Sequence, residues 1–186
     1  MSDKRNLLVD TALRLFYDHG VNNVGINEVL KVAGVAKKTL YHHFSSKEAL
    51  VLATLEARDQ RFLSWLDGCL SGQTDDAAVV QALFHALDDW FHDRVTELDT
   101  FRGCFFINTS AELGEKDSRI AEYCAAHKRH VRALLRNRLE CRDAQWLDLL
   151  FLLKEGAIVS AHIGAERDAA LRCIPLALTH LRHLRH

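Results

Sequence analysis

The sequence predicts an all-α fold in which an N-terminal three-helix domain with a helix-turn-helix is followed by a larger helical domain, about nine helices in total. The chain of 186 residues contains one proline, and its nine glycines fall mainly at the ends of candidate helices. Apolar residues make up 48% of the sequence and recur at helical spacing, whereas no segment alternates as a half-buried strand does. These observations favour helix from end to end.

Residues 27–48 carry the strongest functional signal, because they predict a short helix, a tight turn and a second short helix. We expect the first helix to follow an Asn27 cap and to end at Gly34, where a positive φ lets the chain reverse. In the second helix Leu40 and Phe44 are four residues apart and predict an inward face. The side chains predicted to point mostly outward are Lys37, Lys38, Thr39, Tyr41 and His42.

These outward side chains suit a groove of DNA. Ammonium groups bind phosphates, and short polar groups reach the edges of bases. Asn27 belongs to the same predicted DNA-binding set. So does Lys47, which lies in the first turn of the helix that an expected capping box of Ser45 and Glu48 starts, and which can share a phosphate with the helix terminus. The pattern indicates a helix-turn-helix motif. The alternative is a structural helical hairpin whose lysines are only solvated.

The segment AGVAKKTLYHHFSSKEAL closely resembles the DNA-binding signature of the TetR family of bacterial transcriptional regulators, AGV-S-K-G-T-LY-x-HF-x-SKE-x-L. The resemblance covers the first third of the chain motif by motif, and residues 51–186 by helix count, length and phrases such as RGCFFINTSAE. Ala36 replaces the family's capping Ser, a loss that typically costs about 1 kcal/mol. Lys38 replaces its Gly, and we expect this cation to strengthen phosphate contacts or to change base preference.

The resemblance implies a sequence-specific transcriptional regulator, most often a repressor, that binds a palindromic operator in double-stranded DNA as a homodimer. It assigns residues 1–47 to a helix-turn-helix DNA-binding domain and residues 48–186 to a ligand-binding and dimerisation domain. A small-molecule inducer of unknown identity would bind the larger domain, shift the helix after Ser46 and release the DNA.

The predicted helix from Asp143 to about Ile163 is apolar on nearly every side. We therefore expect one face to be buried in the subunit's own core and another against a second subunit. Small residues recur at every fourth position on one side of it, where a second helix can approach closely. With two leucines of the last helix, these residues form the predicted dimer interface: Gly156, Ser160, Gly164, Leu171 and Leu178. The alternative is that both helices pack within one subunit.

The larger domain also holds candidates for a ligand pocket, in which aromatic rings line the walls and a few polar groups orient the ligand. The candidate rings are Phe62, Trp65, Phe84, Phe105, Phe106, Tyr123 and Phe151, and the candidate polar groups are His85, Asn108, Glu112 and His127. Aromatic residues at helical spacing more often belong to a plain hydrophobic core, so that alternative remains open.

Composition narrows the classes of function. The net charge of −1 divides into +2 for residues 1–50 and −3 for the remainder, which suits a protein that touches DNA with one end. Five scattered cysteines predict buried thiols, and eleven histidines show no metal-ligand spacing. Neither a nucleophile elbow, nor a phosphate loop, nor HExxH is present, so we expect no metal, no cofactor and no enzymatic activity.

The N-terminus lacks the apolar core of a signal peptide, and no apolar run approaches the length of a membrane span, so we expect a cytoplasmic protein without a membrane partner. The competing hypothesis is a helical small-molecule, metal or redox sensor whose DNA-binding head is not its main activity. Cys104 and Cys124 are the candidate redox groups for that hypothesis.

Overall fold

The computed structural model describes residues 2–113 and 118–184, and the predicted all-α class is confirmed over these residues, which contain no strand. A 3-10 turn, Thr96–Leu98, lies between α5 and α6. The helices in chain order are α1 Ser2–His19, α2 Ile26–Ala33, α3 Lys37–His43, α4 Lys47–Leu70, α5 Asp76–Phe91, α6 Phe105–Leu113, α7 Arg119–Arg138, α8 Ala144–Ile163 and α9 Ala169–Leu184.

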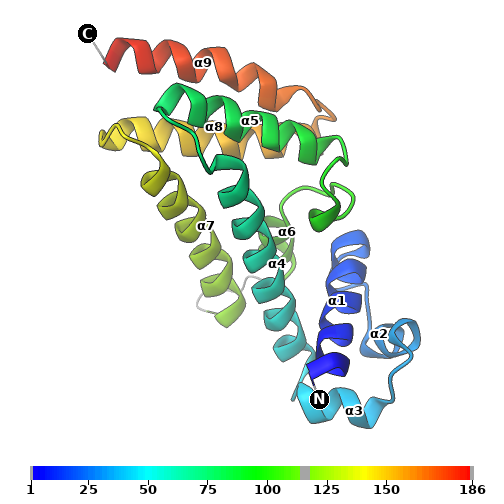
Figure 1. The fold of residues 1–186 in the computed structure, drawn as a ribbon. Coiled ribbons are helices and arrows are strands. Elements are labelled where there is room, and N and C mark those ends of the chain that lie inside the picture. The colour runs from blue at the N-terminus through cyan, green and yellow to red at the C-terminus, as the bar shows by residue number, and fades with distance from the viewer. Residues whose placement is uncertain (1, 114–117, 185–186) are drawn as a thin grey trace. The chain divides into compact units, whose positions relative to one another are not determined.

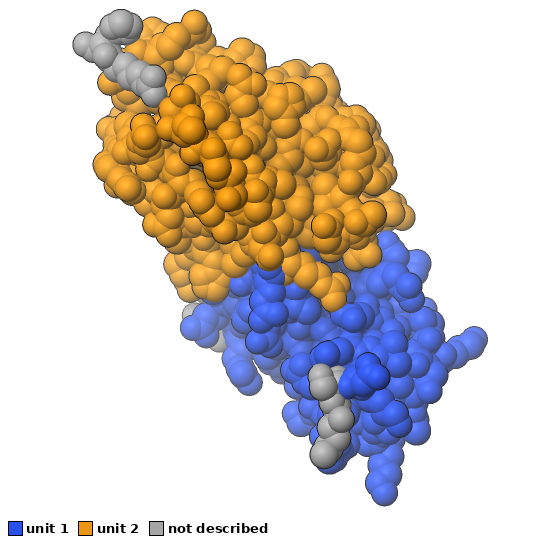
Figure 2. All heavy atoms as spheres, viewed as in Figure 1, with its two compact units in different colours: residues 1–60, 105–127 blue, residues 61–104, 128–186 orange. Residues whose placement is uncertain are grey.

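The chain divides into two compact units, which are coloured separately in Figure 2. Unit 1 comprises residues 1–60 and 105–127, and unit 2 comprises residues 61–104 and 128–186. Helices α4 and α7 each contribute residues to both units. The functional boundary expected at residue 47 lies within unit 1 and stays a prediction.

In unit 1 the first three helices pack together, with α1 against both α2 and α3 (Figure 1). The packing face of α1 follows from its sequence, because Leu8, Ala12 and Phe16 recur at helical spacing and all three are buried. The helix ends at His19, and Gly20 follows it with φ 86°. Glycine adopts this left-handed conformation without the steric cost that a β-carbon brings.

Two of the expected helix caps are wrong by one or two residues. Helix α2 begins at Ile26 with Gly25 as its N-cap, so Asn27 lies in the first turn. At the start of α4 the Ser46 hydroxyl, rather than that of Ser45, accepts a hydrogen bond from the Ala49 N–H at 3.1 Å. A cap contributes only about 1 kcal/mol, so the packing of a helix readily overrides the cap preference of its sequence.

In unit 2, α5 packs against α9 and α8, and α8 packs against α9 (Figure 1). The side chain of Asp75 caps α5 by accepting from the Ala78 N–H at 2.8 Å, and Asp143 caps α8 in the same way. Asp76 is buried and accepts from the backbone N–H groups of Glu140 and Cys141, which fixes the turn after α7 against the start of α5.

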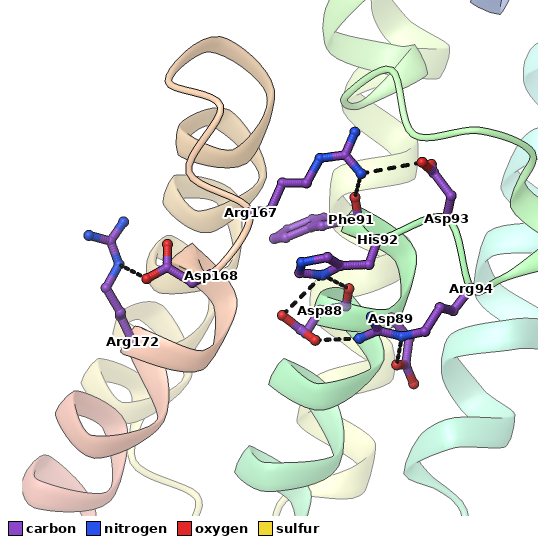
Figure 3. A network of polar contacts seen from close by, with 9 residues as sticks. All are labelled: Asp88, Asp89, Phe91, His92, Asp93, Arg94, Arg167, Asp168 and Arg172. Atoms are coloured by element: carbon purple, nitrogen blue, oxygen red, sulfur yellow. Dashed lines mark hydrogen bonds and ion pairs between the residues drawn. The ribbon is translucent and has the colours of Figure 1, made fainter.

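A polar network joins the end of α5 to the residues that precede α9 (Figure 3). Arg167 donates to the Phe91 carbonyl at 2.8 Å and pairs with Asp93 at 3.3 Å. The Phe101 N–H donates to the other carboxylate oxygen of Asp93, and this hydrogen bond, with Arg167, holds the pKa of Asp93 below its usual value. Arg94 pairs with the carboxylates of Asp88 and Asp89 in the last turn of α5.

None of the helices within residues 2–113 and 118–184 combines the length and the apolar character that crossing a membrane requires.

Candidate functional site

Helix α3 is anchored by its inward face, as the sequence predicts: Leu40 and Phe44 are both buried. The turn before it is made by Gly34, which has φ 64° and donates its N–H to the Leu30 carbonyl. Ala36 occupies the N-cap position without a side-chain bond, while the Thr39 N–H donates to the Ala36 carbonyl at 2.9 Å. The short helix is therefore held by packing, because its cap contributes no side-chain bond.

The opposite face of α3 is the candidate DNA-reading surface. Lys37, Lys38, Tyr41 and His42 are exposed, and Thr39 is half-buried. Within the part of the chain that the structure describes, neither lysine makes a hydrogen bond or an ion pair. Both ammonium groups are therefore available to phosphates, although contact with DNA stays a prediction for each of these residues.

Lys47 and Asn27 differ from the α3 side chains. Asn27 is exposed in the first turn of α2. The Lys47 ammonium is half-buried: it donates to the Val21 carbonyl at 2.6 Å and lies 5.8 Å from the centroid of the Phe16 ring. An ammonium group carries three donors, so this bond to the α1–α2 turn leaves two for a phosphate.

Glu112, a candidate ligand-pocket residue, is bonded to the same turn. Its carboxylate accepts from the Asn22 N–H at 2.7 Å, and its carbonyl accepts from the Asn22 amide at 3.3 Å. Gly20 gives this carboxylate room, because a β-carbon at that position would lie 3.1 Å from Glu112 Oε1. The end of α6 is thereby tied to the turn that precedes the helix-turn-helix.

A hollow of about 360 Å³ opens beside this bond. It is lined by residues of the α1–α2 turn, the first turns of α4 and the two ends of the α6–α7 connection, namely Asn22, Lys47, Glu48, Val51, Glu112, Leu113, Ser118 and Ile120.

The other pocket candidates in unit 1 belong to a buried polar core. His127 is 2% exposed, its Nδ1 lies 2.7 Å from Asp59 Oδ1, and its ring stacks on Phe106 with 3.6 Å between centroids. Tyr123 is half-buried, and its burial, with Asp59 and Glu56, raises its pKa to about 12. Phe105 is buried, and Asn108 is half-buried.

Two pocket candidates in unit 2, Phe62 and Trp65, belong to a cluster of aromatic rings in edge-to-face contact. Phe62 lies 5.3 Å from Trp65 and 5.5 Å from Trp90, and Trp90 lies 4.9 Å from Phe101, all between ring centroids. Phe84 is fully buried, Phe151 is half-buried, and His85 lies on the exposed side of α5. Trp90 and Phe101 also belong to this ring cluster, but the sequence does not predict them as pocket residues.

Unit 2 also holds a group of charged residues that the sequence does not predict. Lys154 of α8 is 1% exposed and pairs with Glu155, and Glu155 also pairs with Lys128 of α7 at 2.6 Å. The only trace of this group in the sequence is the pair KE within an otherwise apolar segment. Elsewhere among residues 2–113 and 118–184, no three His, Cys, Asp or Glu side chains converge as a metal site requires.

The candidate dimer surface combines small residues with exposed apolar ones. Gly156 of α8 and Gly164, the residue directly after α8, are exposed, and Ser160 is half-buried. Large side chains on α8 and α9 also lie open to solvent, with Leu152 66%, Ile163 78% and Leu176 60% exposed, while Leu171 is exposed and Leu178 is half-buried. Apolar side chains exposed on two adjoining helices are typical of a protein–protein interface.

Comparison with known proteins gives consistent similarities. The family model described as "Bacterial regulatory proteins, tetR family" matches residues 8–54. The HTH-type transcriptional repressor NemR of Escherichia coli (strain K12) is 31% identical over 197 aligned positions, which cover 98% of this chain and 94% of NemR. The HTH-type transcriptional activator FasR of Mycolicibacterium smegmatis is 35% identical over 92 residues, a match that spans only 42% of FasR and 49% of this chain.

Solved structures are similar along nearly the whole chain. The crystal structure of SCO4454, a TetR-family transcriptional regulator from Streptomyces coelicolor, superimposes with a TM-score of 0.83 at 25% identity and covers 97% of this chain and 96% of that one. The reduced form of E. coli NemR superimposes with a TM-score of 0.80 at 26% identity, covering 94% of this chain and 95% of NemR.

Proposed function

The chain belongs to the TetR family of bacterial transcriptional regulators and is a DNA-binding regulator, and we propose that it represses transcription as a homodimer on a palindromic operator until an inducer releases it. The observation that carries this proposal is the exposed polar face of α3, held in place by the buried Leu40 on its other side. Two such faces, related by two-fold symmetry, would enter successive major grooves about 34 to 36 Å apart.

In the proposed complex, the roles of the α3 side chains follow from their chemistry. Lys37 and Lys38 bind phosphates, because both ammonium groups are exposed and lack competing partners within the described residues. Tyr41 contacts a phosphate or a sugar, while Thr39 and His42 lie nearest to the bases. Lys47 adds a phosphate contact from the start of α4, and Asn27 adds a polar contact from α2.

The homodimer is supported by the exposed apolar side chains of α8 and α9. Leu152 and Ile163 are among the most exposed large hydrophobic residues of the described chain. Burying such a side chain against a second subunit contributes favourable free energy, and complete burial of a fully exposed one would contribute roughly 1.5 to 3 kcal/mol. Gly156 and Ser160 would let the two subunits' helices approach closely.

Induction needs a ligand that binds the DNA-releasing conformation more tightly than the DNA-bound one. Two bonds within unit 1 connect the turn before the helix-turn-helix with helices outside it: Glu112 of α6 with Asn22, and Lys47 of α4 with Val21. We propose that an inducer in the larger domain moves α6 or the start of α4 and, through these bonds, changes the position of the two DNA-binding domains of the dimer.

The test is the selection of bound duplexes from a random DNA pool at two salt concentrations, followed by sizing of the complex. The full chain is expected to enrich an inverted repeat and to bind it as two protomers. The matched control is a protein in which Lys37 and Lys38 are both replaced by alanine, which should fold but enrich nothing.

Salt-sensitive binding without enrichment would contradict sequence-specific recognition. No binding at either salt concentration would favour the competing hypothesis of a sensor whose main activity is elsewhere. A single protomer bound to a single half-site would contradict the homodimer.

A further inference from the structure

A buried cation lies among aromatic rings in unit 2. The Lys154 ammonium is 5.2 Å from the centroid of the Phe151 ring and 6.0 Å from that of Phe62. Its ion-pair partner is the carboxylate of the adjacent residue, Glu155, which is itself mostly buried. Lysine is almost never fully buried unless it is paired. The stability of the buried Lys154 ammonium therefore depends on how fully the Glu155 carboxylate is available to it.

That partner is shared. Glu155 also pairs with Lys128, whose ammonium lies 2.6 Å from Glu155 Oε2. Burial disfavours the charged form of Glu155, but Lys154 and Lys128 outweigh this effect and hold its pKa below the usual value. One carboxylate therefore serves two ammonium groups, and the three side chains carry a net charge of +1 when all are ionised.

Lys154 is buried and Lys128 is half-buried, so the excess positive charge is partly removed from water, which is unfavourable. Burial lowers the pKa of Lys154, although Glu155 opposes this effect. The nearby Arg132 does not alter the balance, because it forms its own ion pair with Asp148. Lys128 also lies 3.4 Å from Cys104 Sγ, so a thiolate at Cys104 is the internal alternative for the missing negative charge.

We propose that Lys154 and Lys128 bind the anionic group of the inducer, which is an organic monoanion, a carboxylate, with an apolar body placed against Phe62 and Phe151. This inference rests on the proposed function and names the class of its ligand. One added negative charge balances the three side chains, so a monoanion fits better than a dianion such as a phosphate monoester. The flanking rings supply the apolar contacts that fix most small ligands in their sites.

The experiment uses the full chain without DNA and two pairs of probes, benzoate with benzamide and octanoate with octanamide. Binding is measured by titration calorimetry and by the shift of the unfolding temperature. Within at least one pair the anion should bind about ten-fold more tightly than its neutral partner, because it forms charge-assisted bonds that the amide cannot form.

Three variants locate the binding. Lys154→Met and Lys128→Met should each remove most of the preference for the anion, whereas Glu155→Gln should increase it, because the competing carboxylate is gone. A merely structural role for Glu155 predicts the opposite, a loss of binding. Arg129→Met, a change of an exposed α7 cation, is the matched control and should leave the preference unchanged.

Equal binding of anion and amide in both pairs, or full preference in Lys154→Met, would overturn the proposal. Anion binding that appears only in Cys104→Ser would also overturn it, since the thiolate would then neutralise the lysines. Circular dichroism shows whether each variant is folded. Because operator selection is measured separately, failure here leaves the DNA-binding role unaffected.

Discussion

Replacing Lys37 by alanine should reduce the salt dependence of DNA binding by an amount that can be calculated. Each phosphate neutralised by a protein cation contributes about −0.9 to the slope of log K against log salt concentration. A symmetric dimer loses two such contacts, so the slope should become shallower by about 1.8. Between 50 and 200 mM salt, the wild-type complex should therefore lose about twelve-fold more affinity than the variant.

The structure makes Lys37 a clean position for this test. Its side chain is exposed and makes no hydrogen bond or ion pair within the described residues, so its removal should leave the fold intact. Fluorescence anisotropy with the selected operator and with a scrambled duplex gives the slope for each sequence. Lys37→Ala should weaken binding to both duplexes, and Arg129→Ala should change neither.

An unchanged slope in Lys37→Ala would remove this residue from the phosphate contacts. A variant that loses affinity for the operator alone would show instead that Lys37 reads a base. Lys47→Ala serves as a contrast, because it also breaks the bond to the Val21 carbonyl and should lower the unfolding temperature as well as the slope.

Three further changes test other parts of the structure. Gly34→Ala should destabilise the protein by about 1 to 2 kcal/mol, because φ is 64° there; an unchanged midpoint in urea would contradict this. Ile163→Asp should yield monomers in sedimentation experiments, and a persistent dimer would place the interface elsewhere. Lys154→Met should stabilise the protein at pH 7, because a buried cation is replaced by an apolar chain while Glu155 keeps Lys128 as its partner. Burial lowers the folded-state pKa of Lys154 below 10.5, so between these two pKa values the unfolded chain binds more protons than the folded one, and the stability of the wild type rises with pH. The stability gained by Lys154→Met should therefore shrink between pH 7 and 10. A gain in thermal unfolding that stays constant over this range would refute the argument.

The helices could be predicted because their apolar residues repeat at helical spacing. The inward positions Leu40 and Phe44 follow from that spacing alone, and both are buried. The expected cap at Ser45 is wrong because the adjacent Ser46 offers the same hydroxyl, and the one at Asn27 is wrong because α2 already begins after Gly25, which has no side chain. The sequence shows the candidate cap residues, but it does not indicate which of them becomes the cap once the helix packs.

Contacts between distant segments could not be predicted in the same way. Glu112 and Asn22 are 90 positions apart, and Lys128 and Glu155 are 27 apart. Periodicity indicates which face of a helix is apolar, but it does not indicate which helix lies opposite. The sequence therefore does not indicate that Glu112 bonds to Asn22, nor that the charged pair within α8 contacts Lys128 of α7.

The bond between Glu112 and Asn22 has a consequence for the engineering of chimeric regulators. A graft that transfers only residues 1–47 to another regulator's body leaves behind the carboxylate that holds the α1–α2 turn. Such a chimera should keep its operator preference yet respond weakly to the inducer of its new body. Adding a glutamate at the matching position of the recipient's α6 helix should restore the response, so a transplantable module is defined by its contacts rather than by a continuous stretch of chain.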